Sequence, residues 1–109
     1  MAYDESLASR VRALMIEEPG FTEKKMFGGI CFLLNGNMAC GLVNNDLIVR
    51  AGLDAWEAAL EQPETRVFDL TGKVMRGWVQ VGPAGTADDA GLADWVARGV
   101  AFARSLPPK

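Results

Sequence analysis

The chain has 109 residues, 50% of them apolar and 23% charged, which is the size and composition of one globular domain. Its net charge of −3 excludes a generally basic protein whose overall field attracts nucleic acid or an anionic membrane surface. The two cysteines and the absence of histidine exclude a Cys–His or Ser–His–Asp nucleophile system and a structural zinc site of four Cys or His ligands.

A helix is predicted over residues 4–17, because Leu7, Val11 and Met15 recur at helical spacing with charged residues between them. The sequence Glu18-Pro19-Gly20 ends this helix, since proline disfavours helical geometry in the residue before it.

Four strands follow, at 22–27, 30–34, 37–43 and 46–50. Asn35-Gly36 predicts a two-residue hairpin between the second and third strands, because both positions of such a turn require a positive φ.

The second half of the sequence predicts a short helix over 54–61, followed by a hairpin of strands 66–70 and 73–81. A loop at 82–85 leads to a closing helix that Thr86 caps. The order α-β-β-β-β-α-β-β-α is typical of an α+β domain with helices packed on a mostly antiparallel sheet. We expect a single domain over 1–109.

The sequence contains no segment that is typical of a membrane span or a signal peptide. The longest apolar runs are far shorter than the roughly 20 residues of a spanning helix, and the acidic start at Asp4-Glu5 is unlike a signal peptide. We therefore expect a cytoplasmic protein.

Lys24-Lys25 precede the glycine pair Gly28-Gly29, but a strand rather than a helix follows the glycines. Phosphate loops and dinucleotide fingerprints both need a helix after their glycines. The pattern favours a bend or bulge at this pair.

The two cysteines lie on either side of the Asn35-Gly36 turn. A two-residue loop would place Cys31 directly opposite Cys40, at a separation that a disulfide could bridge. The reducing cytosol favours two buried thiols, and a redox switch is the alternative.

Apolar residues occupy both faces of this predicted hairpin, and the chain has few helices to cover them. The surplus apolar face indicates a protein partner or a homodimer contact, since large exposed apolar patches mark interfaces. The alternative is that the helices divide between the two faces.

Arg76, Trp78 and Gln80 share one face of the predicted strand 73–81. This arrangement suits recognition of a peptide or a nucleotide, and the alternative is a tryptophan half covered by a helix. A convergent basic patch of Lys24, Lys25, Arg50 and Arg76 beside Trp78 would be the candidate partner-binding site; the alternative is a solvated strand face.

The segments "KKMFGGICFLLNGNMACG", "LIVRAG", "TGKVMRGWVQVGPAG" and "LADWVARGVAFARSLPPK" together resemble the N-terminal domain of the TfoX/Sxy family, proteins linked to regulation of natural competence. The resemblance covers nearly the whole chain and implies a short, stand-alone member. It also implies a fold like that of the type III secretion chaperones, and it supplies no catalytic residues.

These observations predict a non-enzymatic regulatory module that binds protein, without cofactor, metal or membrane. The first alternative is a nucleic-acid-binding domain that uses Lys24, Lys25, Arg50, Arg76 and Trp78; the net charge and the lack of a DNA-reading helix disfavour it. The second is a thiol redox sensor that uses Cys31 and Cys40; their apolar neighbours disfavour a reactive thiol.

Overall fold

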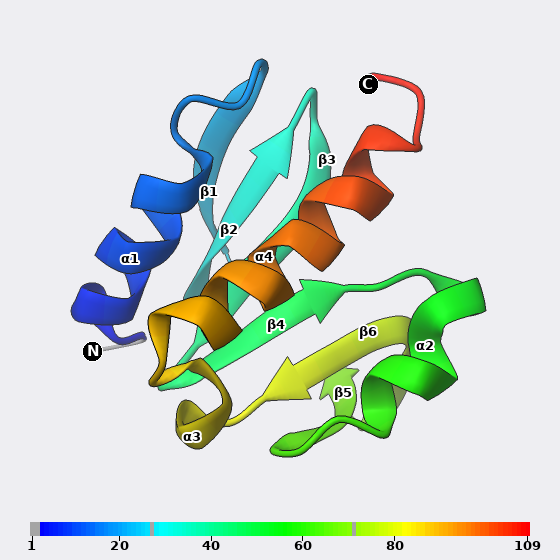
Figure 1. Cartoon of the computed structure of the whole chain (residues 1–109). Coiled ribbons are helices and arrows are strands. Elements are labelled where there is room, and N and C mark those ends of the chain that lie inside the picture. Colours follow the sequence, from blue (N-terminus) through cyan, green and yellow to red (C-terminus); the bar gives the residue numbers. More distant parts are fainter. Residues whose placement is uncertain (1–2, 27, 71) are drawn as a thin grey trace.

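The computed structural model describes residues 3–26, 28–70 and 72–109 (Figure 1). Its elements are, in chain order, α1 (Glu5–Met15), β1 (Phe21–Met26), β2 (Gly29–Leu34), β3 (Asn37–Val43), β4 (Asp46–Arg50), α2 (Leu53–Leu60), β5 (Thr65–Leu70), β6 (Lys73–Val81), α3 (Pro83–Thr86) and α4 (Asp89–Arg104). The predicted α+β class and element order are confirmed, and the short helix α3 occupies the predicted loop. Phe27 and Thr71, which the sequence assigns to the first strand and to the second hairpin turn, lie outside the described residues.

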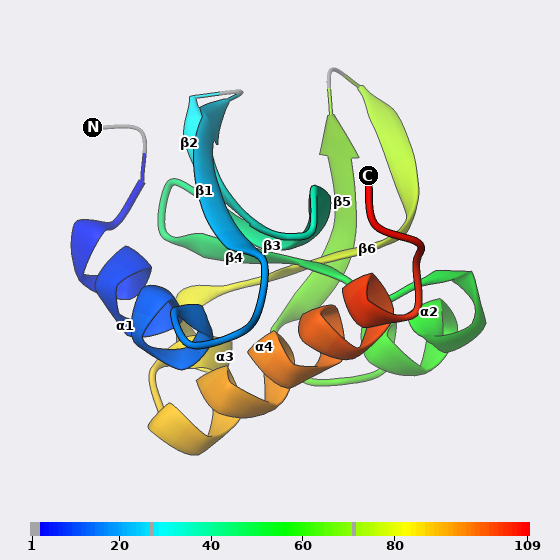
Figure 2. The same cartoon turned by 90° about the horizontal axis from the view of Figure 1, so that it is seen from above.

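The six described strands form an antiparallel sheet in the order β1-β2-β3-β4-β6-β5. Figure 2 shows the helices on one side of this sheet, whereas the β1–β2 and β5–β6 hairpins curve away from it on the other side. We call the side that no described helix covers the open face. Within the described residues, no helix has both the length and the apolar character needed to cross a membrane.

The main hydrophobic core lies between the sheet and the helices. α1 and α4 bury the stripes that helical spacing predicts: Leu7, Val11, Met15, Leu92, Trp95 and Val96. Each large apolar side chain buried in this way contributes about 1.5–3 kcal/mol to stability. Asp4 caps α1, since its carboxylate accepts from the backbone N–H groups of Ser6 and Leu7.

The cap of α4 differs from the prediction. Asp88 is the N-cap residue, and its carboxylate accepts from the N–H of Gly91 at 3.2 Å. Thr86 is buried in α3, where its hydroxyl donates to the carbonyl of Pro83. The extra turn of α3 therefore moves the N-cap of α4 two residues along the chain, from Thr86 to Asp88.

α4 approaches the sheet closely at Gly99. A Cβ atom at this position would lie 2.3 Å from the carbonyl oxygen of Ala39 in β3. Side-chain carbons do not approach backbone oxygens so closely, so the packing of α4 on β3 depends on glycine here.

The turn between β2 and β3 is confirmed, since Asn35 and Gly36 both have positive φ angles, of 51° and 84°. The register beyond it is not the predicted one. Leu33 pairs with Met38, whereas Phe32 pairs with Cys40, so Ala39 is an extra residue in β3. This is a β-bulge, and it shifts the pairing by one residue.

The bulge separates the two cysteines. Cys31 pairs with Gly41 rather than with Cys40, and the predicted cross-strand cysteine pair is therefore wrong. Because side chains alternate along a strand, a slip of one residue moves a side chain to the opposite face. Cys31 lines the open face, and Cys40 belongs to the core beneath the helices.

A second irregularity lies at Gly77 in β6, whose φ of 89° only glycine adopts readily. Its carbonyl accepts hydrogen bonds from the N–H groups of both Ala51 and Gly52, at 2.8 and 3.0 Å. β6 is thereby tied to the segment between β4 and α2.

The break at Gly77 changes which side chains of β6 share a face. Met75 and Trp78 both line the open face, although simple alternation would separate them. The Arg76 guanidinium lies instead 5.9 Å from the ring of Trp56 in α2. Arg76 therefore does not line the open face with Trp78, although the two residues line a second pocket together with Arg50 and Phe102.

Candidate functional site

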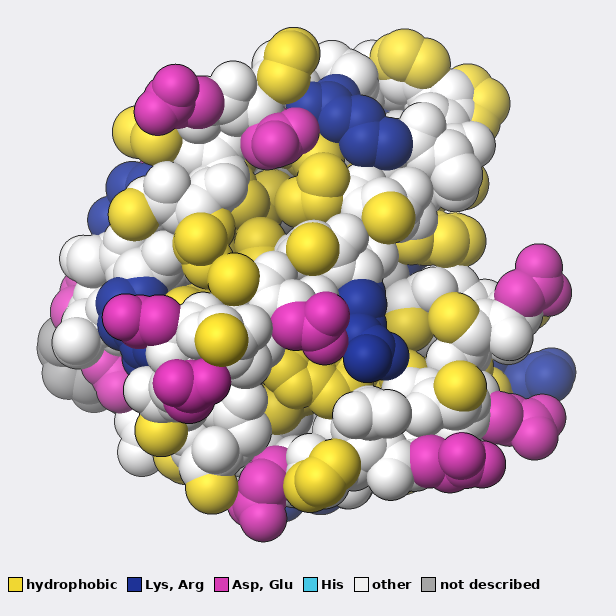
Figure 3. Space-filling view, in the orientation of Figure 1, with side chains coloured by type: hydrophobic (Ala, Val, Ile, Leu, Met, Phe, Trp, Pro, Cys, Tyr) yellow, Lys and Arg dark blue, Asp and Glu magenta, His cyan; other side chains and the backbone are white. Residues whose placement is uncertain are grey.

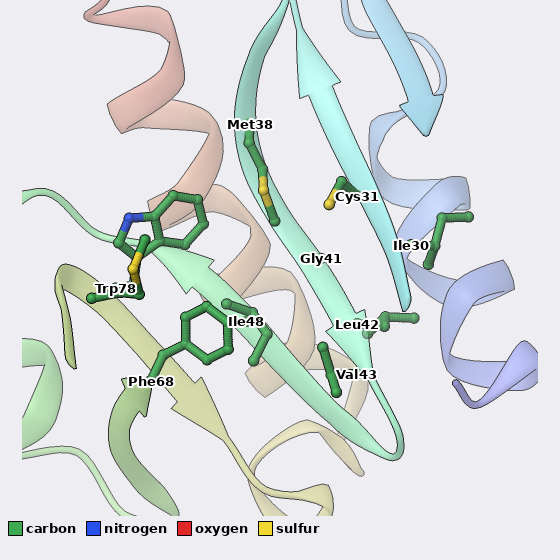
Figure 4. Close-up of a pocket in the computed structure, with 10 residues that line it drawn as sticks. Ile30, Cys31, Met38, Gly41, Leu42, Val43, Ile48, Phe68 and Trp78 are labelled. Carbon is green, nitrogen blue, oxygen red and sulfur yellow. The ribbon is translucent and has the colours of Figure 1, made fainter. Parts of the chain in front are cut away.

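The open face carries an apolar hollow of about 130 Å³ (Figure 4). Figure 4 shows Phe68 and Trp78 on one side of it and Cys31 on the other, with Ile48 between them. The residues that line it come from five strands: Ile30, Cys31, Met38, Gly41, Leu42, Val43, Ile48, Phe68, Met75 and Trp78. We call this cavity the hollow.

Gly41 and Met38 shape the β3 side of the hollow. A Cβ atom at Gly41 would lie 2.7 Å from the terminal methyl of Met38 and 2.8 Å from the carbonyl oxygen of Ile30. The missing side chain leaves room that the methionine methyl occupies. Because methionine has three rotatable bonds and a polarisable sulfur, Met38 and Met75 allow this lining to adapt its shape.

Aromatic rings form the wall opposite Cys31. The ring centroids of Phe68 and Trp78 lie 6.4 Å apart with the ring planes inclined by 51°. The Arg50 guanidinium lies 5.3 Å from the Trp78 ring and 5.2 Å from the ring of Phe102 in α4. These two cation–π contacts link Trp78, and with it this wall of the hollow, to α4.

Polar side chains gather around Asp46 at the start of β4. Its carboxylate accepts from Arg66 at 2.8 Å and from the Gln80 amide at 2.5 Å. The Asp46 side chain is only 14% exposed, whereas that of Arg66 is 66% exposed. The ion pair neutralises Asp46 and leaves the arginine accessible to solvent.

The five residues of the predicted basic and aromatic site do not form one patch. Arg50, Arg76 and Trp78 do come together, since they line one pocket with Phe102 of α4. The Arg76 guanidinium lies against Trp56 of α2 at the same time. Lys24 and Lys25 are exposed on the edge strand β1, which β2 and β3 separate from β4.

The two thiols differ in position but share an apolar environment. Burial raises the pKa of the Cys31 thiol, and the charge of Lys24 opposes part of this effect. Burial raises the pKa of Cys40 to about 12, and Cys31 adds to this shift. The Cys40 sulfur lies 3.7 Å from the sulfur of Met15. Neither environment promotes a thiolate.

Metal ligands are also not grouped. Over residues 3–26, 28–70 and 72–109, no set of three or more cysteine and carboxylate side chains is placed to hold a metal ion.

The helix side of the molecule has a different surface, on which acidic, basic and apolar side chains are interspersed (Figure 3). Several of its charges are joined in ion pairs of 2.9–3.1 Å: Arg10–Asp89, Arg98–Asp94 and Arg104–Glu18. This interspersed surface is typical of a solvated face.

Sequence reasoning missed several residues of the site, namely Ile48, Phe68, Met75 and the polar group around Asp46. The signal that could have found Ile48 is the fully apolar run 47–49, since a strand buried on both faces is continuously apolar. No sequence pattern indicated the break at Gly77 that brings Met75 and Trp78 to one face, or the bulge at Ala39 that separates the two cysteines.

A comparison with protein families identifies the chain. The family model described as the TfoX N-terminal domain matches residues 14–103. The chain belongs to this family. The match spans the segment from the end of α1 to the end of α4, and so includes all the strands that build the hollow of this TfoX N-terminal domain. Among curated proteins and among solved structures, the comparisons found no match.

Proposed function

We propose that this TfoX N-terminal domain is a non-enzymatic regulatory module that binds another protein through its open face, in transcriptional regulation of the competence type. Family membership supports the regulatory role. The observation that carries the proposal is the apolar hollow on a face that no described helix covers. A contiguous apolar surface of this kind marks an interaction site in soluble domains.

The environment of the thiols supports a binding role rather than a thiol-based reaction. A nucleophilic or redox-sensing cysteine needs a lowered pKa, and burial raises the pKa of both Cys31 and Cys40. In this proposal Cys31 is part of the wall of the hollow.

Two valines provide a matched test. Val43 lines the hollow and pairs with Asp46, whereas Val74 is exposed on β6, does not line the hollow and pairs with Asp69. V43K and V74K each place a lysine opposite an aspartate, so both variants should fold. Only V43K introduces a charge into the hollow.

The experiment is affinity capture of wild type, V43K and V74K from an extract of the protein's own cells, with and without nuclease, read by mass spectrometry. We expect a partner protein that survives nuclease, is retained by V74K and is lost with V43K. Capture that is abolished by nuclease would contradict the proposal in favour of nucleic-acid binding. Equal capture by both variants would exclude the hollow as the contact surface.

A further inference from the structure

The hollow also indicates the chemistry of what it binds. Resting on the proposed function, we infer that it accepts a single aromatic side chain from an acidic peptide segment, whose carboxylates lie against basic side chains of the open face.

The size of the hollow limits what can enter. Its volume of about 130 Å³ is close to that of an engineered apolar cavity of roughly 150 Å³ that binds benzene. Pockets for whole small-molecule ligands are larger, at about 300–1,000 Å³. The hollow therefore suits one ring that belongs to a larger molecule.

The lining determines which ring fits. The lining side chains are aliphatic, aromatic or sulfur-containing, and the polar groups Asp46, Arg66 and Gln80 are not among them. A nucleobase in this position would lose hydrogen bonds with water and gain few, because burying an unpaired polar group is unfavourable. A phenyl ring has no such groups, and Phe68 and Trp78 offer it aromatic faces and edges.

The charges around the hollow indicate what flanks the ring. Strand pairing and alternation place four charged side chains of the described strands on the open face without a contact to α4, three basic and one acidic: Lys24, Arg66, Lys73 and Asp46. The whole chain, in contrast, has 14 acidic and 11 basic residues. The open face is thus basic on an acidic protein, which favours an acidic partner.

The strand register places Lys24 beside the hollow. It pairs with Cys31 across β1 and β2, so the two side chains share a face. Its neighbour Lys25 pairs with Ile30, which borders the hollow but belongs to the core on the helix side. Alternation therefore directs Lys25 to that opposite side, where Glu23 and Arg12 form an ion pair. Both lysines are exposed, and no ion pair joins either one to another described residue. They form a second matched pair for experiment.

The test uses short fluorescent peptides with one phenylalanine between aspartates and glutamates, and fluorescence anisotropy with the full chain. Control peptides replace phenylalanine by alanine, or the acidic residues by lysines. We expect binding of the acidic phenylalanine peptide, at least about tenfold weaker binding of the alanine peptide, and weakening by salt. K24Q should weaken binding by about two- to fivefold, and K25Q should have little effect.

The alkylation rate of Cys31 reports whether the hollow is occupied, and it can be measured in the protein without substitutions. It lines the hollow, whereas Cys40 lies on the other side of the sheet. We expect the acidic phenylalanine peptide to slow alkylation of Cys31 by a small reagent at alkaline pH and to leave Cys40 unaffected. V43K should bind the peptide weakly although it adds a positive charge, because the charge blocks entry of the ring.

Three outcomes would overturn the inference. They are equal binding of the acidic and basic peptides, binding that is insensitive to the phenylalanine, and a dimer of the chain that V43K dissociates in sedimentation. Capture from the cell extract can still yield a nuclease-resistant partner that V43K loses. In that case the proposed function stands, and only the inference about the acidic segment fails. If no partner is captured but the peptide binds as expected, the inference about the acidic phenylalanine segment stands and the proposed function loses its support.

Discussion

The substitution Gly99→Ala tests how α4 is held on the sheet. In an exposed helix, alanine would stabilise by about 1 kcal/mol relative to glycine. At Gly99 the new methyl group would lie 2.3 Å from the carbonyl oxygen of Ala39 and 3.0 Å from its carbon. Both are backbone atoms of a buried strand, which cannot move aside as a flexible side chain can.

Overpacking of this kind costs about 1–3 kcal/mol, and the backbone contact places G99A near the upper value. After the gain in helix propensity is subtracted, we expect a net loss of roughly 2 kcal/mol, which is a fall in melting temperature of about 8 °C or more. Urea and thermal unfolding followed by circular dichroism measure both quantities.

The matched control is A97G, at an exposed position in the same helix, which should destabilise by about 1 kcal/mol through propensity alone. If G99A instead stabilises the protein as an ordinary helix glycine-to-alanine change would, then α4 does not contact β3 at Ala39. The assignment of the helix side and the open face would then have to be revised.

Other predictions concern the thiols and the ion pair between α1 and β1. Mild oxidation should produce no intramolecular disulfide between Cys31 and Cys40, since they lie on opposite faces; mass spectrometry that found this disulfide in folded protein would contradict the bulged register. Arg12 donates two hydrogen bonds to Glu23, at 2.7 and 2.8 Å, and lowers the pKa of that carboxyl. Because both side chains are partly solvated, E23Q should reduce stability at neutral pH by at most about 1 kcal/mol. This difference is fully present above the pKa that Glu23 has in the unfolded chain, and it should vanish as the pH falls through the lower pKa of the folded state. A difference that persists in acid would exclude the ion pair as its cause.

The fold was largely predictable because each element has a local signal. The helical spacing of Leu7, Val11 and Met15, and the Asn35-Gly36 turn, depend on neighbouring residues alone, and the structure confirms both. The surplus apolar face was also predicted, and all the described helices indeed lie on the other side of the sheet.

The composition of the site was not predictable, because it depends on the two places where strand alternation fails. The extra residue Ala39 places Cys31 and Cys40 on opposite faces of the sheet, where a regular hairpin would have placed them opposite each other on one face. Gly77 brings Met75 to the face of Trp78 and directs Arg76 toward α2. A bulge arises from how a strand packs against its neighbours and against α4, and the sequence of one hairpin does not contain that information.

The central claim is that the partner contacts the open face, and site-specific photo-crosslinking tests it most directly. Lys73 and Val74 are adjacent and exposed on β6, and alternation places Lys73 on the face of Met75 and Val74 on the opposite one. A photoreactive residue is introduced at each position in turn in cells, and crosslinked proteins are identified by mass spectrometry. The account predicts a specific crosslinked partner from position 73 and none from position 74. A partner captured from position 74 alone would contradict it.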